Sequence, residues 1–184
     1  ASGSVTQTTA VALIAQNDIT VTATNDVDLV TTTVSGVGDV KVTANDIDAT
    51  DIFDIDDGNL ILTSTGSRID VEEVDLEDGA VTITSATGFD ASAAIAATND
   101  VAITATNEVV LDSTVTTTLG GITISGNDIK ASADIEATAG SVTLTATNDT
   151  ATSDIDANIT GVSVAITSGK WDADDGNLAT DNQQ

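Results

Sequence analysis

Acidic side chains are the residues whose number and spacing in this sequence could support chemistry. The densest group, DIFDIDDGN, spans residues 51–59, and a second acidic group follows one repeat later, from Glu72 to Asp78. This offset pairs carboxylates of the two groups: Asp51 with Glu72, Asp54 with Asp75, Asp56 with Glu77, and Asp57 with Asp78. Carboxylates stacked on neighbouring strands repel one another and need a counter-charge. Ca²⁺ is the expected ion because it takes about six to eight oxygen ligands of this kind.

The predicted calcium ligands lie in two segments. The first supplies Asp54, Asp56, Asp57, Asn59, Asp75, Glu77 and Asp78. The second, DADDGNL at residues 172–178, repeats the pattern of residues 54–60 and adds Asp172, Asp174 and Asp175. The same periodicity also predicts stacks of Asp134 on Asp154 and of Glu136 on Asp156. The alternative is that these acids only solvate an outer surface, because neither an EF-hand loop nor the nonapeptide repeat of calcium-binding β-rolls is present.

Other chemistry has few candidate residues. The chain has no His, no Cys, four Lys and Arg, and a net charge of −26. A nucleic-acid-binding protein needs a basic surface, so nucleic acids and anionic membranes are not expected partners. A polysaccharide-cleaving enzyme would need a suitable base and aromatic side chains for the sugar, and only Phe53, Phe89 and Trp171 are aromatic. We therefore expect no enzyme activity, no organic cofactor and, without an apolar run of about 18 residues, no membrane insertion.

The elements that carry these acids are predicted to be strands. Hydrophobic residues make up 40% of the chain, nearly all of them Val, Ile, Leu and Ala, and Thr occurs 33 times. Branched side chains of this kind favour strands, and no long stretch shows the 3.6-residue apolar period of a helix. The chain is therefore predicted to be all-β.

The predicted fold follows from a recurring four-residue motif. Each motif is an apolar residue, then any residue, then a second apolar residue, then Thr. Its first position recurs at a nearly constant step, at Ile19, Val40, Leu60, Val81, Val101, Ile122, Val142 and Val162. Its outward Thr position forms a column of Thr22, Thr43, Thr63, Thr84, Thr104, Ser125, Thr145 and Ala165. The outward Thr pairs would also suit an ice-binding surface, but Lys41, Ile61 and Ala102 interrupt the neighbouring column.

Two further apolar columns predict a second and a third strand in each repeat. The second column is Val27, Ile47, Ile69, Phe89, Val109 and Ile129, and the third is Val34, Ile55, Leu76, Ile95, Val115, Ile135 and Ile155. Gly and Asn pairs before the first strands suit sharp corners. The predicted fold is a right-handed parallel β-helix, or β-solenoid, with three short strands in each coil of about 20–21 residues and about nine coils. An evenly spaced β-sandwich is the alternative, but it would show longer loops.

Three segments resemble repeats of the filamentous haemagglutinin type, found in large bacterial exoproteins of two-partner secretion: NDITVTATN at 17–25, NDVAITATN at 99–107 and GSVTLTATN at 140–148. The resemblance covers roughly residues 18–169. It implies a right-handed β-helix, export to the cell surface, and a role in adhesion or surface structure, with no catalytic residues to transfer. The chain departs from that family in being much shorter, with no secretion domain ahead of the repeats.

The two ends are predicted to complement each other within one domain of residues 1–184. Residues 1–18 form an incomplete coil with a second and a third strand near Val5 and Ile14 but no first strand. Residues 170–184 form an irregular coil or joint that includes Trp171 and, at Leu178, resembles the start of a first strand. We expect an extracellular or cell-surface fibre subunit that stacks head-to-tail with copies of itself, with Ca²⁺ as a stabilising ion. The alternative is a fragment of a large secreted surface adhesin that binds cell-surface or matrix glycans.

Overall fold

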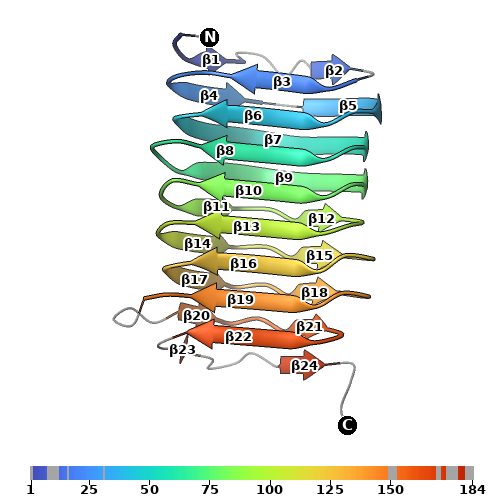
Figure 1. The fold of residues 1–184 in the computed structure, drawn as a ribbon, viewed down its shortest axis with the longest axis vertical. Helices are drawn as coiled ribbons and strands as arrows, with labels where there is room; N and C mark the ends of the chain where they lie inside the picture. The colour runs from blue at the N-terminus through green and yellow to red at the C-terminus, as the bar shows by residue number, and fades with distance from the viewer. Residues whose placement is uncertain are drawn as a thin grey trace.

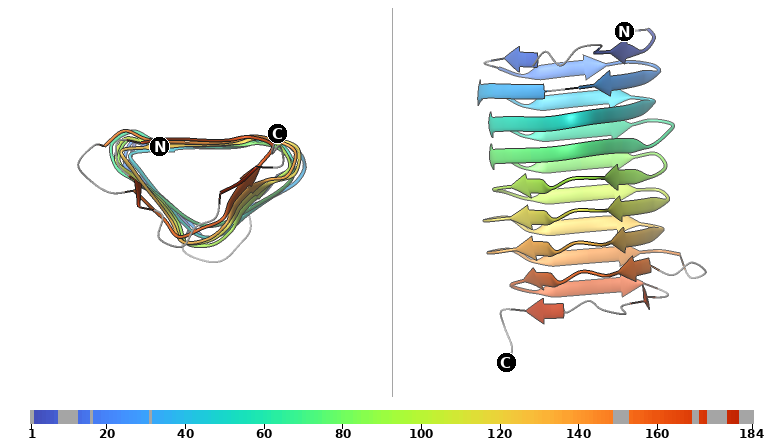
Figure 2. Two further views of the ribbon diagram at one scale, coloured as in Figure 1. Left: turned by 90° about the horizontal axis from the view of Figure 1, so that it is seen from below. Right: turned by 180° about the vertical axis from the view of Figure 1, so that it is seen from behind.

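Short runs of alternating inward apolar and outward polar residues wind this chain into a stack of triangular coils (Figure 2). The computed structural model describes residues 2–7, 13–15, 17–30, 32–148, 153–168, 171–172 and 178–180. Along the first face in Figure 1 the strands run from right to left, and the chain returns behind them while it steps down the rod. The fold is therefore the predicted all-β, right-handed parallel β-solenoid.

The first face is an eight-stranded parallel sheet that needs no register shift along its length. In order along the rod its strands are β3 (Ile19–Thr22), β6 (Val40–Ala44), β8 (Leu60–Ser64), β10 (Val81–Ser85), β13 (Val101–Ala105), β16 (Ile122–Gly126), β19 (Val142–Ala146) and β22 (Val164–Ser168). These eight strands delimit seven complete turns, so about nine coils was a slight overestimate.

The other two faces join into one 16-stranded sheet. The second face contains β1 (Val5–Thr6), β4 (Asp26–Leu29), β11 (Phe89–Ala91), β14 (Glu108–Leu111), β17 (Asp128–Ala131), β20 (Ser153–Ile155) and β23 (Trp171–Asp172). The third contains β2 (Leu13–Ala15), β5 (Thr32–Val37), β12 (Ile95–Ala97), β15 (Val115–Thr117), β18 (Ile135–Ala137), β21 (Ile159–Gly161) and β24 (Leu178–Thr180). Two long strands, β7 (Asp46–Asp57) and β9 (Ile69–Asp78), pair with strands of both faces and connect them.

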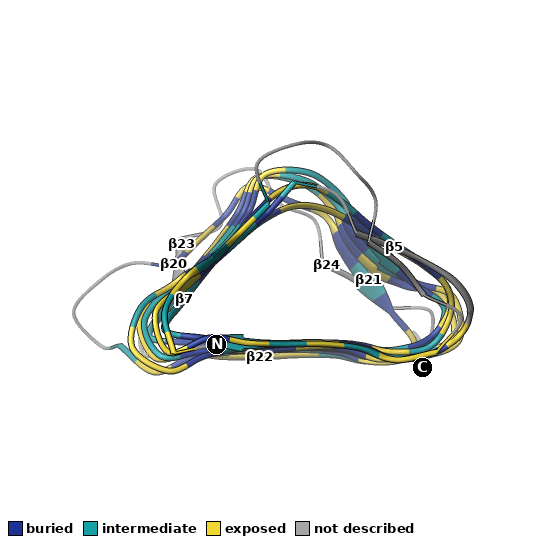
Figure 3. Ribbon diagram, turned by 90° about the horizontal axis from the view of Figure 1, so that it is seen from above, coloured by how far each residue is buried: buried dark blue, intermediate teal, exposed yellow. Residues whose placement is uncertain are grey.

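The core is a continuous apolar column inside the triangle. Figure 3 colours the buried residues on the ribbon. Alternate residues of a strand point to one side of the sheet, which places Val, Ile and Leu inside. The predicted second column is confirmed, because Val27, Ile47, Ile69, Phe89, Val109 and Ile129 are paired in register and fully buried. The first column is confirmed from Ile19 to Val142.

The predicted third column mixes two inward positions. Ile95 pairs with Val74, and Leu76 pairs with Ala97. Ile95, Val115 and Ile135 therefore form one column, and Val34, Ile55 and Leu76 form another, two residues further along the strands. On β9 both positions are inward, because Val74 and Leu76 are both buried, and an apolar pattern alone therefore did not separate them.

The last coils depart from the predicted register because the step between them lengthens. Ile135 pairs with Ile159, and Ile155 pairs with Ala131 on the second face instead of joining the third. On the first face Val142 pairs with Val164, so the predicted position Val162 is wrong; its side chain is 40% exposed. The shift moves Thr167, not Ala165, into register with Thr145.

The corner between the third and first faces depends on glycine. A Cβ on Gly58 would lie 1.9 Å from the carbonyl oxygen of Gly38, and a Cβ on Gly79 would lie 1.8 Å from that of Gly58. Gly58 also has a φ of 148°, a backbone conformation that residues with a Cβ rarely adopt. At Gly58 and Gly79, successive coils therefore meet through backbone that leaves no room for a side chain.

Candidate functional site

The acidic segments of β7 and β9 lie side by side, largely as predicted. Asp54 pairs with Asp75, and Asp57 pairs with Asp78. Asp56 and Glu77 lie between these pairs at the same level and are both exposed. The predicted pair of Asp51 and Glu72 falls at a register irregularity between Ala49 and Ile52.

Two of the predicted calcium ligands have another structural role. The Asn59 side-chain amide donates to Asp39 Oδ1 at 3.0 Å, and its carbonyl oxygen accepts from the Ala80 backbone N–H at 3.0 Å. Asp78 Oδ1 accepts from Asn99 Nδ2 at 3.3 Å. Asn59 and Asp78 thus connect successive coils at the glycine corner.

The predicted calcium site stays a prediction. Among the residues that the structure describes, no group of three or more acidic side chains comes together in a way that could hold a metal ion. Of the three predicted ligands in the second segment, only the backbone of Asp172 is described; it lies in β23, where it pairs with Asp154 of β20. Asp174 and Asp175 lie outside the described residues.

The two other predicted carboxylate stacks are wrong. Asp154 pairs with Lys130, not with Asp134, and Glu136 pairs with Thr160, not with Asp156. Asp134 Oδ1 instead accepts hydrogen bonds from the backbone N–H and the side-chain amide of one residue, Asn158, at 3.0 and 2.9 Å. Because the coil is lengthened, Asp154 lies beside the cation Lys130, and Asp134 lies beside the amide of Asn158, instead of beside another carboxylate.

A ladder of four aspartates on the second face was missed by the sequence reasoning. Asp28, Asp48, Asp70 and Asp90 follow one another in register on β4, β7, β9 and β11, and we call them the aspartate ladder. The signal was a recurrent Asp directly after the second apolar column. Burial raises the pKa of Asp48 above its ordinary value, and the charges of Asp28 and Asp46 raise it further.

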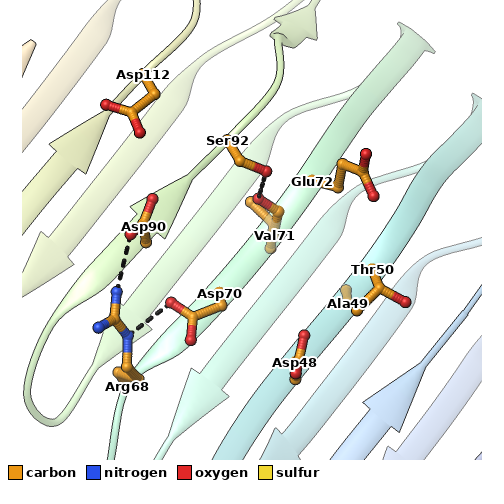
Figure 4. A pocket seen from close by; sticks show the side chains of 10 residues that line it. All are labelled: Asp48, Ala49, Thr50, Arg68, Asp70, Val71, Glu72, Asp90, Ser92 and Asp112. Atoms are coloured by element: carbon orange, nitrogen blue, oxygen red, sulfur yellow. Dashed lines mark hydrogen bonds and ion pairs between the residues drawn. The ribbon is translucent and has the colours of Figure 1, made fainter.

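Arg68 is the cation that relieves part of this repulsion. Its guanidinium lies 2.6 Å from Asp70 Oδ1 and 3.1 Å from Asp90 Oδ2, and so bridges two coils (Figure 4). Burial nevertheless raises the pKa of Asp70, against the opposing effect of Arg68. Arg68, Asp70 and Asp90 line an open depression of about 390 Å³. Both ion pairs are half-exposed, so each contributes only modestly to stability.

We predict that the protein becomes more stable as the pH falls from 7 toward 4. Burial and neighbouring carboxylates raise the pKa values of Asp48, Asp54 and Asp70 above 3.8, so the folded state binds protons more tightly than the unfolded chain. This stabilisation is complete below pH 3.8 and is lost as the pH rises through the raised pKa values. Calorimetry should show a higher Tm at pH 4 than at pH 7.

Substitution of the ladder provides the control for this pH dependence. Asp48→Asn should raise the Tm at pH 7 and reduce its dependence on pH, whereas the same change at the exposed Asp156, outside the ladder, should do neither. A Tm that stays constant or falls on acidification would contradict the electrostatic interpretation.

The four predicted assembly residues all lie in the terminal coils. Val5 is partly buried in β1 and pairs with Val27, and Ile14 lies in β2 and pairs with Thr33. Trp171 lies in β23 beside Ser153. Leu178 lies in β24 and pairs with Ile159 on the third face, so its assignment to a first strand is wrong. The side chains of Ile14, Trp171 and Leu178 are outside the described residues.

Both ends of the first face are open strand edges. In the described sheet, β3 pairs only with β6 and β22 pairs only with β19. At the β22 end the inward Ile166 is 36% exposed, whereas its counterpart one coil above, Leu144, is fully buried. At the β3 end Ile19 and Val21 are only partly buried. An unpaired parallel edge with uncovered core residues is a surface on which another coil can pair.

Comparison with known proteins adds no relative to this geometry. No protein-family model, no curated protein and no solved structure matches the chain. The fold is that of a parallel β-helix repeat protein. The described part of the chain contains no helix that could span a lipid bilayer.

Proposed function

We propose that this chain is a structural element of an extracellular fibre and that its coils stack head-to-tail on those of another copy. It acts as a rod and not as an enzyme, and it carries no organic cofactor. The resemblance to filamentous haemagglutinin-type repeats supports a location outside the cell or at its surface.

The observation that carries this proposal is the match between the two open edges. Strand β22 presents Val164, Ala165, Ile166 and Thr167, and β3 presents Ile19, Thr20, Val21 and Thr22. Placed below β22 in register, β3 of a second copy would continue both inward apolar columns and the outward Thr column. The contact uses different surfaces on the two copies and does not close on itself, so it would build a filament.

The alternative is that the rod is a segment of a large surface adhesin. In that case further coils of the same chain would cover the edges of β3 and β22, and glycans would be the expected ligands. The size of the native product separates the two proposals. A free product near 18.4 kDa supports the subunit, and a far larger product supports the adhesin.

Ile166→Lys tests the end-to-end contact. A charge at this inward position would be buried in the joint, so filaments should shorten to single rods in sedimentation experiments. Thr116→Lys makes the same charge change at an outward position in the middle of the rod, on β15, and should leave the filaments intact. Filaments that survive Ile166→Lys, or are lost equally in both variants, would contradict stacking through β22.

A further inference from the structure

We propose that the outer surface of the first face is a second interaction surface, through which two copies of the chain pair side by side. The first observation is its charge. The eight strands of this face contain none of the 30 Asp and Glu residues of the chain, and Lys41, in the second strand, is their only charged residue. On a protein of net charge −26, the strands of this face are thus free of carboxylates, and Asp18, Asp39 and Asp100 lie only at its edge, directly before three of the strands.

The second observation is the regularity of the surface. One outward column is an unbroken row of hydroxyl side chains in register: Thr22, Thr43, Thr63, Thr84, Thr104, Ser125, Thr145 and Thr167. The neighbouring column is Thr20, Lys41, Ile61, Thr82, Ala102, Thr123, Thr143 and Ala165. Apart from Lys41 and Ile61 these side chains are short, so two such faces can approach to the roughly 10 Å at which sheets pack.

The charge distribution selects a second copy as the occupant. The second face carries the aspartate ladder, and β7 and β9 carry the paired acids that continue onto the third face. Two rods of net charge −26 would bring these carboxylates together if they met through either of those faces. Contact through the first face gives the least electrostatic repulsion between the two rods. A basic partner would be drawn to the acidic faces instead.

The area is sufficient for a reversible dimer. Eight strands about 4.8 Å apart, with four or five residues across the sheet, give a flat surface of roughly 500 to 600 Å² on each copy. The total of about 1,100 Å² exceeds a typical crystal contact and falls at the low end of specific interfaces. Such a dimer uses the same face twice and closes on itself. It leaves the edges of β3 and β22 free, so lateral pairing does not depend on end-to-end stacking.

Sedimentation of the Ile166→Lys protein, in which end-to-end stacking is blocked, isolates the lateral contact. We expect a monomer–dimer equilibrium that shifts toward dimer as NaCl rises from about 0.05 to 0.5 M, because salt screens the repulsion between the rods. Adding Thr104→Lys should weaken dimerisation at least tenfold. This change lowers the net negative charge, so general repulsion cannot explain the loss. Adding Thr116→Lys, an equal charge change on the third face, should leave the equilibrium unchanged.

Three results would overturn the proposal. The first is a monomer at every salt and protein concentration. The second is an equal effect of Thr104→Lys and Thr116→Lys, with circular dichroism confirming that both variants fold. The third is a monomer that shapes growing ice crystals and loses this effect with Thr104→Lys, which would assign the face to ice.

Discussion

Gly58→Ala is expected to destabilise the protein by at least about 2 kcal/mol, because the substitution combines backbone strain with a steric clash. Gly58 has a φ of 148°, and a Cβ at this position would lie 1.9 Å from the carbonyl oxygen of Gly38. The clashing atom belongs to the backbone of the coil above and cannot rotate away. Relief would therefore require two coils to separate at their corner, which weakens the stacking that holds the rod together.

Gly88→Ala is the matched control for the glycine corner. The nearest atom to a Cβ there is the carbonyl oxygen of Glu108, at 3.4 Å, an ordinary contact. Urea unfolding should therefore give nearly the same midpoint for Gly88→Ala as for the parent protein, and a clearly lower one for Gly58→Ala. Equal midpoints for the two variants would show that the corner can open without cost.

Phe89→Ala is expected to cost about 3–5 kcal/mol, the range for truncating a large buried aromatic side chain. Phe89 is fully buried and stacks between Ile69 and Val109 in the second inward column. The coils above and below hold these neighbours in register, so the structure cannot collapse into the cavity. Each coil depends on its neighbours, and a void in the middle of the rod weakens both halves.

Leu119→Ala removes a comparable side chain from the surface. Leu119 is 67% exposed, so its loss should change the free energy of unfolding by less than about 0.5 kcal/mol. The comparison in urea separates core packing from loss of apolar surface in general. A cost below about 1 kcal/mol for Phe89→Ala would contradict a core of tightly stacked columns.

The sequence predicted the first two strand columns well because both keep a nearly constant step and alternate cleanly between apolar and polar positions. The third face was harder for a physical reason. Strands β7 and β9 run through the bend between two faces, and the register between them shifts between Ala49 and Ile52. Inward neighbours on one strand, such as Val74 and Leu76, are equally apolar and cannot be told apart by pattern.

The candidate surfaces were predicted only in part. Pairing of Asp54 with Asp75 followed from a constant step, whereas the step of the aspartate ladder varies from coil to coil and was hidden among other acids. The unbroken hydroxyl column became visible only when the structure moved the last strand from Val162 to Val164. A lengthened coil leaves no periodic trace in the sequence, so it could be located only through strand pairing.

Electron microscopy of the purified protein is the most direct test of the proposed fibre. A single rod of eight strands about 4.8 Å apart is only about 35 to 40 Å long. We predict filaments many times this length, with a constant triangular cross-section and an axial repeat of about 4.8 Å, that shorten to single rods with Ile166→Lys. Uniform particles of single-rod length at high protein concentration, with and without Ca²⁺, would contradict end-to-end stacking.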